Sequence, residues 1–315
     1  MALAQAKEAP LRRHSGPCID SVADYGIIDC ASCGYRHVLP LPDPAAAEAL
    51  YTHDYYGKEK PAYLAHANED AEWLTLHYAD RLRIAESALA GHKGRRLLDV
   101  GAGPGFFAAH ALSAGYDVTA IEPSAQAAEH GRSLGLDIRE ETYSEALADT
   151  LGPVDVVHMM NVLEHVPDPD ELLARAFDQL RPGGVLIVGV PNDYSPFQTT
   201  LRRARDFRPW WVAPPHHLNY FDFASLSRLL VRTGFEVAER YTSFPMDLFL
   251  LLGENYIEEP ARGRECHERR KALDLDLEAA GHGAVRRAFY GALAEAGLGR
   301  EAILFARKPR APHGA

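Results

Sequence analysis

The sequence predicts an α/β fold with a doubly wound sheet, and three observations support this prediction. The stretch 95–122 reads as a short apolar strand, a glycine-rich turn, a helix and a second strand. Apolar runs of strand length alternate with segments of helical spacing as far as residue 241. The run Val154–Met160 is apolar almost throughout, as expected of a strand buried on both faces of a parallel sheet.

The overall composition is that of a soluble globular protein. Of 315 residues, 47% are hydrophobic and 24% are charged, which suits one large or two modest domains. The formal net charge of −11 repels polyanions, so we expect neither nucleic acid nor a membrane as a partner. No apolar run approaches the ~18 residues that a membrane span needs. Four cysteines do not form a disulfide framework in a chain of this length, and we expect a cytoplasmic protein.

The N-terminal region is predicted to contain a disordered tail and a metal-binding knuckle. Residues 1–16 lack the apolar segment of a signal peptide, and we expect them to be disordered. Cys30 and Cys33 then form a C-x-x-C pair, in which two thiolates can hold one zinc ion. Cys18 and His37 would complete the tetrahedron. The alternative is a knuckle that packing alone maintains.

A tyrosine-rich stretch and one long helix follow the knuckle, and residues 17–94 as a whole are predicted to form an N-terminal knuckle and helical cap. Tyr56 lies in the tyrosine-rich part, where it either closes over a substrate or packs against the main domain. Helical spacing over 68–90, ended by Gly91, predicts a single helix at one side of the site.

The glycine-rich turn after the first core strand carries the main functional signal. Gly101 and Gly103 lack β-carbons, which lets a ligand approach the backbone closely. Glu122, at the tip of the next strand, can accept hydrogen bonds from a ribose diol. A dinucleotide-binding turn has a third glycine at the position that Phe106 occupies here. The pattern therefore favours a different nucleoside ligand, with Asp99 at the head of the motif.

The later core elements follow in a regular order. A helix is expected over 124–134, a short strand over Asp137–Arg139 and a buried strand over Val154–Met160. Asp168, followed by proline and an acidic residue three positions on, predicts the start of another helix. The turn R-P-G-G at 181–184 then leads into a further strand.

Four of these features together resemble the class I S-adenosylmethionine-dependent methyltransferases. They are the turn D-x-G-x-G-x-G, the step Glu122-Pro123, the stretch N-V-L-E-H-V at 161–166 and the turn R-P-G-G. The resemblance implies a Rossmann-like, seven-stranded sheet over 95–243, closed by a last strand within 301–310. It also implies S-adenosylmethionine as the methyl donor. The residues that the resemblance assigns to this cofactor are Asp99, Gly101, Ala102, Gly103, Glu122, Pro123, Thr142, Tyr143, Asn161 and Val162.

A segment at 195–221 interrupts the core pattern, and we expect it to form a lid over the substrate. Arg202 and Arg205 can bind a phosphate or carboxylate of the substrate, or else lie on a solvated helix face. Tyr220, like Tyr56, is a candidate for orienting the methyl acceptor.

Three histidines are candidates for a catalytic base. In methyltransferases that this chain resembles, a histidine near the position of His216 and His217 reaches the acceptor. A neutral imidazole can take a proton from a hydroxyl or a carbon acid near neutral pH. His165, in the N-V-L-E-H-V stretch, is the third candidate. The alternative is that these histidines are structural and bond to the lid backbone.

The segment 244–300 is predicted to be a helical insertion, including a polar helix over 267–279. It either covers the substrate or provides a homodimer surface. The predicted reaction is methyl transfer to an oxygen, nitrogen or carbon atom of a small molecule, such as a sugar nucleotide or a natural-product intermediate. Two other functions stay open: an NAD-linked oxidoreductase, and a non-catalytic interaction protein with a zinc knuckle.

Overall fold

A mixed seven-stranded sheet forms the centre of the protein. The computed structural model describes residues 14–42, 63–89, 91 and 94–310. The strand order is β10-β11-β8-β7-β4-β5-β6, and β11 alone runs antiparallel to its neighbours in this sheet. The strands are β4 (Arg96–Val100), β5 (Asp117–Ile121), β6 (Asp137–Arg139), β7 (Val154–Met160), β8 (Leu180–Pro191), β10 (Glu236–Tyr241) and β11 (Glu301–Arg307). This topology confirms the predicted doubly wound α/β fold.

Helices cover both faces of the sheet, as alternating side chains of the buried strands require. Leu97 faces one apolar core together with α3 (Ala71–Ala88), α4 (Phe106–Ser113) and α5 (Ala125–Ser133). The next residue, Leu98, faces the opposite core with α6 (Glu145–Leu151), α7 (Pro169–Gln179) and α9 (Phe223–Arg232). This period of two follows from the geometry of a strand.

Of two helices whose starts were predicted, α7 begins as expected and α3 begins a few residues later. The Asp168 side chain accepts a hydrogen bond from the backbone N–H of Glu171, which confirms the predicted cap of α7. The single helix predicted over 68–90 is present as α3, but it begins at Ala71, because residues 68 and 69 belong to a separate helix, α2 (Tyr63–Glu69).

The first three strands form a second, small sheet with a strand from far along the chain. Its order is β1 (Cys18–Val22), β2 (Tyr25–Asp29), β3 (Arg36–Leu39) and β9 (Asn219–Tyr220). Trp211 and Leu218 pack in the same small core as Ile27 and Val38. The segment 195–221, which includes α8 (Pro196–Arg205), is therefore bound to the N-terminal strands, and the expectation of a simple lid needs correction.

The tail prediction also needs correction where the structure describes it. The Ser15 carbonyl accepts a hydrogen bond from the Ala31 N–H at 2.9 Å, and a β-carbon on Gly16 would lie 1.9 Å from the Asp29 carbonyl oxygen. Residues 14–16 are thus packed against the knuckle rather than disordered. The preceding part of the predicted tail, and Tyr56, lie outside the described residues.

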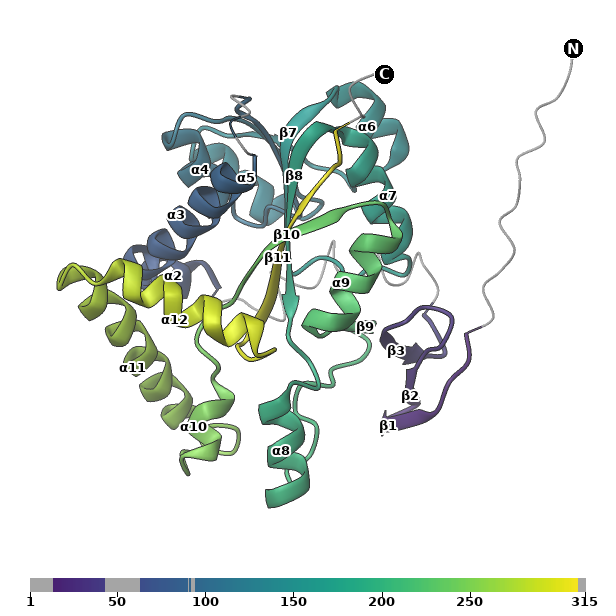
Figure 1. The fold of residues 1–315 in the computed structure, drawn as a ribbon, viewed down its shortest axis with the longest axis vertical. Coiled ribbons are helices and arrows are strands. Elements are labelled where there is room, and N and C mark those ends of the chain that lie inside the picture. The colour runs from purple at the N-terminus through teal and green to yellow at the C-terminus, as the bar shows by residue number, and fades with distance from the viewer. Residues whose placement is uncertain (1–13, 43–62, 90, 92–93, 311–315) are drawn as a thin grey trace, which may run out of the picture.

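The predicted insertion consists of α10 (Asp247–Leu251), α11 (Pro260–Ala279) and α12 (Gly283–Glu295). Figure 1 shows α11 and α12 on the same side of the molecule as α3, away from β1, β2 and β3. The Asp274 carboxylate on α11 accepts hydrogen bonds from Trp73 and His77 of α3, and from Tyr290 of α12. Among the described residues, none of the helices is long and apolar enough to cross a bilayer. No disulfide joins the four cysteines.

Candidate functional site

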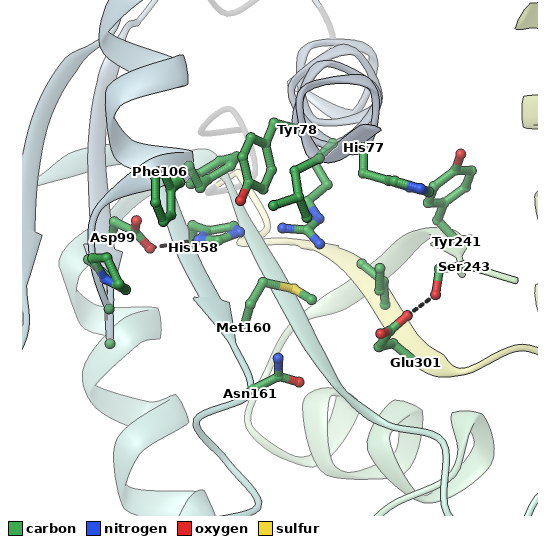
Figure 2. Close-up of a pocket in the computed structure, with 18 of the residues that line it drawn as sticks. His77, Tyr78, Asp99, Phe106, His158, Met160, Asn161, Tyr241, Ser243 and Glu301 are labelled. Atoms are coloured by element: carbon green, nitrogen blue, oxygen red, sulfur yellow. Dashed lines mark hydrogen bonds and ion pairs between the residues drawn. The ribbon is translucent and has the colours of Figure 1, made fainter. Parts of the chain in front are cut away.

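A cavity of about 300 Å³ opens at the carboxyl ends of β4 and β7. One end is lined by the glycine turn and by Asp99, and the other by residues of β10, β11 and α11. Figure 2 shows Asp99 and His158 at one side and Ser243 and Glu301 at the other, with Met160 between them. Crevices at this edge of a parallel sheet are where open α/β proteins bind ligands.

The glycine turn can form only with residues that tolerate a left-handed backbone. Gly101, Gly103 and Gly105 have φ values of 69°, 54° and 84°. A β-carbon on Gly101 would also lie 2.6 Å from Cγ2 of Val162. The structure thus brings the predicted residues Gly101 and Val162 into contact, and Gly101, Ala102, Gly103 and Asn161 line the cavity.

Glu122 supports this turn from beneath. Its carboxylate accepts hydrogen bonds from the backbone N–H groups of Gly103 at 2.8 Å and Ser124 at 2.9 Å. The side chain is fully buried and is not among the residues lining the cavity. Its predicted contact with a ribose diol stays a prediction, while its contact with the turn is a finding. Burial raises the pKa of Glu122 to about 7, the two N–H donors oppose this, and Asp99 raises the pKa further.

The raised pKa of Glu122 predicts a pH-dependent stability. The folded carboxyl keeps its proton up to about pH 7, whereas the unfolded one loses it near 4.5. Between these values the folded state binds more protons, so stability should fall as pH rises, by up to about 3 kcal/mol. Glu122→Gln cannot ionise and should lack this slope. Urea denaturation of the wild type and of Glu122→Gln at several pH values between about 4.5 and 7 measures the change in stability. Equal pH dependence in the two proteins would contradict the raised pKa of Glu122.

A buried pair beside the turn was not predicted. His158 Nδ1 lies 2.6 Å from Asp99 Oδ1, and the imidazole stacks on Phe107 with ring centroids 3.6 Å apart. Burial lowers the pKa of His158, although Asp99 opposes the shift, so the ring is neutral at pH 7. Nδ1 then donates to Asp99, and Nε2 is left as an acceptor. The sequence feature that could have revealed this pair is a histidine, His158, in the middle of a mostly apolar strand.

At this end of the cavity, three buried polar atoms have no hydrogen-bond partner among the described residues. They are Asp99 Oδ2, His158 Nε2 and Arg81 Nε, and all three residues line the cavity. Buried polar atoms are usually paired, so such a cluster indicates a polar ligand. Arg81 comes from α3 together with Trp73 and His77, a polar and aromatic stripe whose helical spacing was read only as a cap.

The three candidate bases lie together, in a place other than the cavity. His165 Nδ1 is 2.6 Å from the His216 carbonyl oxygen, and the rings of His165 and His217 are 5.0 Å apart. The Glu164 carboxylate is 3.7 Å from His165 Nε2. None of these side chains is among those lining the cavity. Their catalytic role stays a prediction, and the structure adds Glu164 to the cluster.

The candidate substrate residues of the predicted lid have structural partners. Arg202 contacts both carboxylate oxygens of Asp20 at 2.6 Å, which joins α8 to β1. Arg205 donates to the carbonyl oxygens of Leu250 and Leu251. Tyr220 is fully buried, and its hydroxyl donates to the His217 carbonyl. These interactions give the three side chains structural roles, and their predicted contact with the substrate stays a prediction.

Four further cofactor candidates do not line the cavity either: Pro123, Thr142, Tyr143 and Val162. Tyr143 is buried in the core, because a large aromatic side chain is more stable away from water. Its hydroxyl donates a hydrogen bond to Gln179 at 3.1 Å. Thr142 is exposed, and Pro123 is partly exposed outside the cavity. The structure therefore groups the predicted cofactor residues of β4, the glycine turn and Asn161, and leaves the 142–143 pair apart.

The knuckle brings four potential metal ligands together, and one of them differs from the set predicted from the sequence. His14, Cys30, Cys33 and His37 lie with their ligand atoms within 4.8 Å of one another. Cys18, predicted to be a ligand, is exposed, and its thiol donates to the Asp20 carbonyl. His14 takes that place because residues 14–17 run back along the end of β2, as the bond from Asp29 N–H to the Pro17 carbonyl shows.

Comparison with known proteins agrees with this geometry. Residues 71–240 match the family model described as "Methyltransferase domain". The chain is 36% identical to a ubiquinone biosynthesis O-methyltransferase of Caulobacter vibrioides over 137 residues, which are 42% of this chain and 54% of that protein. A protein of the same name from Methylococcus capsulatus is 38% identical over 133 residues, 39% of this chain and 55% of that protein. The chain thus spans about half the length of these curated relatives.

Solved structures with a similar arrangement are more distant in sequence. A magnesium protoporphyrin IX methyltransferase of Synechocystis with bound S-adenosylhomocysteine has a TM-score of 0.49 at 13% identity, over 86% of this chain and 100% of that one. An N1-methyltransferase of Burkholderia thailandensis has a TM-score of 0.48 at 17% identity, over 92% of this chain and 97% of that one. The family match covers more than half of the chain and includes the glycine turn, β4 to β8 and the cavity residues of α3. The chain therefore belongs to the methyltransferase domain family, as a class I S-adenosylmethionine-dependent methyltransferase.

Proposed function

We propose that the protein transfers the methyl group of S-adenosylmethionine to a nucleophilic atom, in the first place a hydroxyl oxygen, of a small molecule. The observation that carries this proposal is the continuous cavity between the glycine turn and the Ser243–Glu301 pair. The names of the curated relatives, which are O-methyltransferases, support oxygen as the nucleophile. The net charge of −11 favours a small acceptor over nucleic acid.

The glycine-turn end of the cavity suits the amino-acid part of S-adenosylmethionine. Asp99 Oδ2 and His158 Nε2 are two buried acceptors, which fit an ammonium group. The guanidinium of Arg81 fits the carboxylate of the same amino acid. When bound, S-adenosylmethionine supplies a methyl group that the adjacent sulfonium makes electrophilic. The chain contributes orientation and the exclusion of water, which can lower a barrier by ~7–11 kcal/mol in favourable cases.

The opposite end suits the acceptor. Glu301 lines the cavity and accepts a hydrogen bond from the Ser243 hydroxyl, so its carboxylate is held in position. A carboxylate in hydrogen-bonding reach of an acceptor hydroxyl can take its proton during methyl transfer. We therefore propose Glu301 as the base, in competition with the predicted histidines.

Replacement of Glu301 separates these two assignments. Glu301→Gln should lower kcat by ~10²–10⁴-fold, the usual contribution of a general base. The assay follows S-adenosylhomocysteine formation with a panel of catechols, phenols and amines at saturating S-adenosylmethionine. Ser243→Ala should cost less, and His217→Ala should retain turnover. Loss of turnover in His217→Ala with full activity of Glu301→Gln would instead identify the histidine cluster as the base.

We also propose a structural zinc ion in the knuckle, held by His14, Cys30, Cys33 and His37. His14 Nδ1 lies 3.0 Å from His37 Nε2, 3.3 Å from Cys33 Sγ and 3.9 Å from Cys30 Sγ. Ligand atoms of a tetrahedral zinc site lie about 3.3–3.8 Å apart.

The surroundings of the knuckle support this metal. His37 Nδ1 lies 2.8 Å from the Val38 carbonyl oxygen, so Nδ1 carries the proton and Nε2 is left as a ligand atom. Gly34, at φ 74°, donates its N–H to the Cys30 carbonyl and closes the tight turn between the cysteines. Four ligands without an open position indicate a structural rather than a catalytic ion.

A further inference from the structure

Arg270 brings a positive charge from the insertion into the cavity. It belongs to α11 and lines the same cavity as Ser243 and Glu301. Its guanidinium carbon lies 4.7 Å from the centroid of the Trp73 ring. Its Nε donates to His267 Nδ1 at 3.0 Å, and His267 Nε2 lies 2.7 Å from Asp70. The side chain is thus stacked and held by one hydrogen bond, with its terminal nitrogens available for a ligand.

Protein carboxylates balance this charge only in part: among the described residues, Glu301 and, more weakly, Asp70 act on it without an ion pair. None of their carboxylate oxygens lies within 4.0 Å of Arg270. Glu301 also lines the cavity, but it is bonded to Ser243 and lies 3.7 Å from Arg300. Burial, and then the nearby Arg300, lower the pKa of Arg270 to about 10, so it is still charged at neutral pH. A partly buried cation whose charge is balanced only in part is costly, and a bound anion removes that cost.

An anion bound to Arg270 would lie apart from the carboxylate of the methyl donor. Trp73, which stacks on Arg270, precedes Arg81 by about 12 Å along α3 at 1.5 Å per residue. Arg81 acts on the charge state of His158, at the glycine-turn end of the cavity. Arg270 instead interacts with Arg300 and Glu301, at the acceptor end. The two arginines therefore serve opposite ends of one cavity.

We propose that the methyl acceptor carries an acidic group, a carboxylate or a phosphate, and that Arg270 binds it. This inference rests on the proposed function and specifies its substrate class. A planar guanidinium matches either oxyanion with two parallel hydrogen bonds. The inserted helix thereby selects the acceptor, while the common core binds the methyl donor.

The test uses the full-length protein saturated with S-adenosylhomocysteine, which fills the donor end. Calorimetric titration with inorganic phosphate and, separately, with benzoate should show saturable binding, and the tighter of the two identifies the acidic group. Arg270→Gln should weaken that binding by about tenfold or more, the effect of one charged hydrogen-bonding partner. Arg264→Gln changes an exposed arginine of the same helix and should bind as the wild type does.

The outcomes distinguish this inference from the proposed function. Arg270→Lys keeps the positive charge but lacks the planar guanidinium and its two parallel hydrogen bonds, so it should give an intermediate affinity for the anion. This variant serves as a control, because a protein that had merely lost its fold would not show an intermediate affinity. Absence of anion binding in the wild type, or equal binding in Arg270→Gln, overturns the inference. So does a loss of S-adenosylhomocysteine affinity in Arg270→Gln, because Arg270 would then hold the donor. Failure of the wild type to bind S-adenosylhomocysteine at all would instead reject the proposed function.

Discussion

Gly101→Ala should weaken the binding of S-adenosylmethionine by about 100-fold, because small displacements of a positioning element have effects of that size. The new β-carbon would be placed 2.6 Å from Cγ2 of Val162, on a backbone with φ of +69°. A left-handed conformation costs a residue with a β-carbon roughly 1–2 kcal/mol, and overpacking costs a further ~1–3 kcal/mol. The turn must therefore move, and it is the wall of the cavity.

Gly115→Ala is the matched control for this change. Gly115 has a φ of +87°, but no atom lies within 4 Å of the β-carbon position. The control should lose stability through backbone strain and keep its affinity for the donor. Calorimetric titration gives the affinities, and thermal unfolding gives the stabilities. Unchanged donor affinity in Gly101→Ala would remove the turn from the binding site, and saturable binding of NAD alone would favour the dinucleotide alternative.

Removal of one ligand of the proposed zinc ion should cause a large loss of stability. Cys33→Ser should lose the metal and the stability that the metal provides, about 4 kcal/mol when free zinc is ~1,000-fold above its Kd. Three of the four ligands, Cys30, Cys33 and His37, are buried, so loss of the ion leaves buried polar atoms without a metal partner. Metal analysis of the purified protein and thermal unfolding with and without a chelator measure the effect.

The choice of the fourth ligand is tested by a pair of variants. His14→Ala should behave like Cys33→Ser, whereas Cys18→Ser should retain zinc, because the Cys18 thiol is exposed and bonds to the Asp20 carbonyl. Equal loss of zinc in Cys18→Ser would restore the ligand set read from the sequence. A wild-type protein that takes up no zinc on refolding in its presence would reject the site.

The elements of the central sheet could be predicted because their signals are local. Val154–Met160 is a strand for the reason that its apolar run suggested, and Asp168 caps its helix through a contact three residues away. The glycine turn is equally local, since its φ values are a property of the residues themselves. Glu122 was recognised by its position at a strand tip, but its burial under the turn depends on how the turn folds back.

The parts that were missed depend on contacts between distant segments. His14 joins the cysteines only because residues 14–17 run beside β2, and no spacing rule includes that return. Arg270 reaches the cavity only because α11 packs against α3. The ion pair of Arg202 with Asp20 was missed because Asp20 lies on the first strand, far away in the sequence. Tertiary contacts of this kind leave no periodic trace in the sequence.

The pairing of β3 with β9 also bears on the order in which the chain can fold during synthesis. Arg36 pairs with Tyr220, so the small N-terminal sheet lacks its last strand until the ribosome has made most of the central domain. Until then, Ile27 and Val38 have no Trp211 or Leu218 to cover them. Domains generally form from the N-terminus as they emerge, and exposed strand edges invite wrong partners. Here the apolar side chains of the earliest strands are covered only after the late strand has been made.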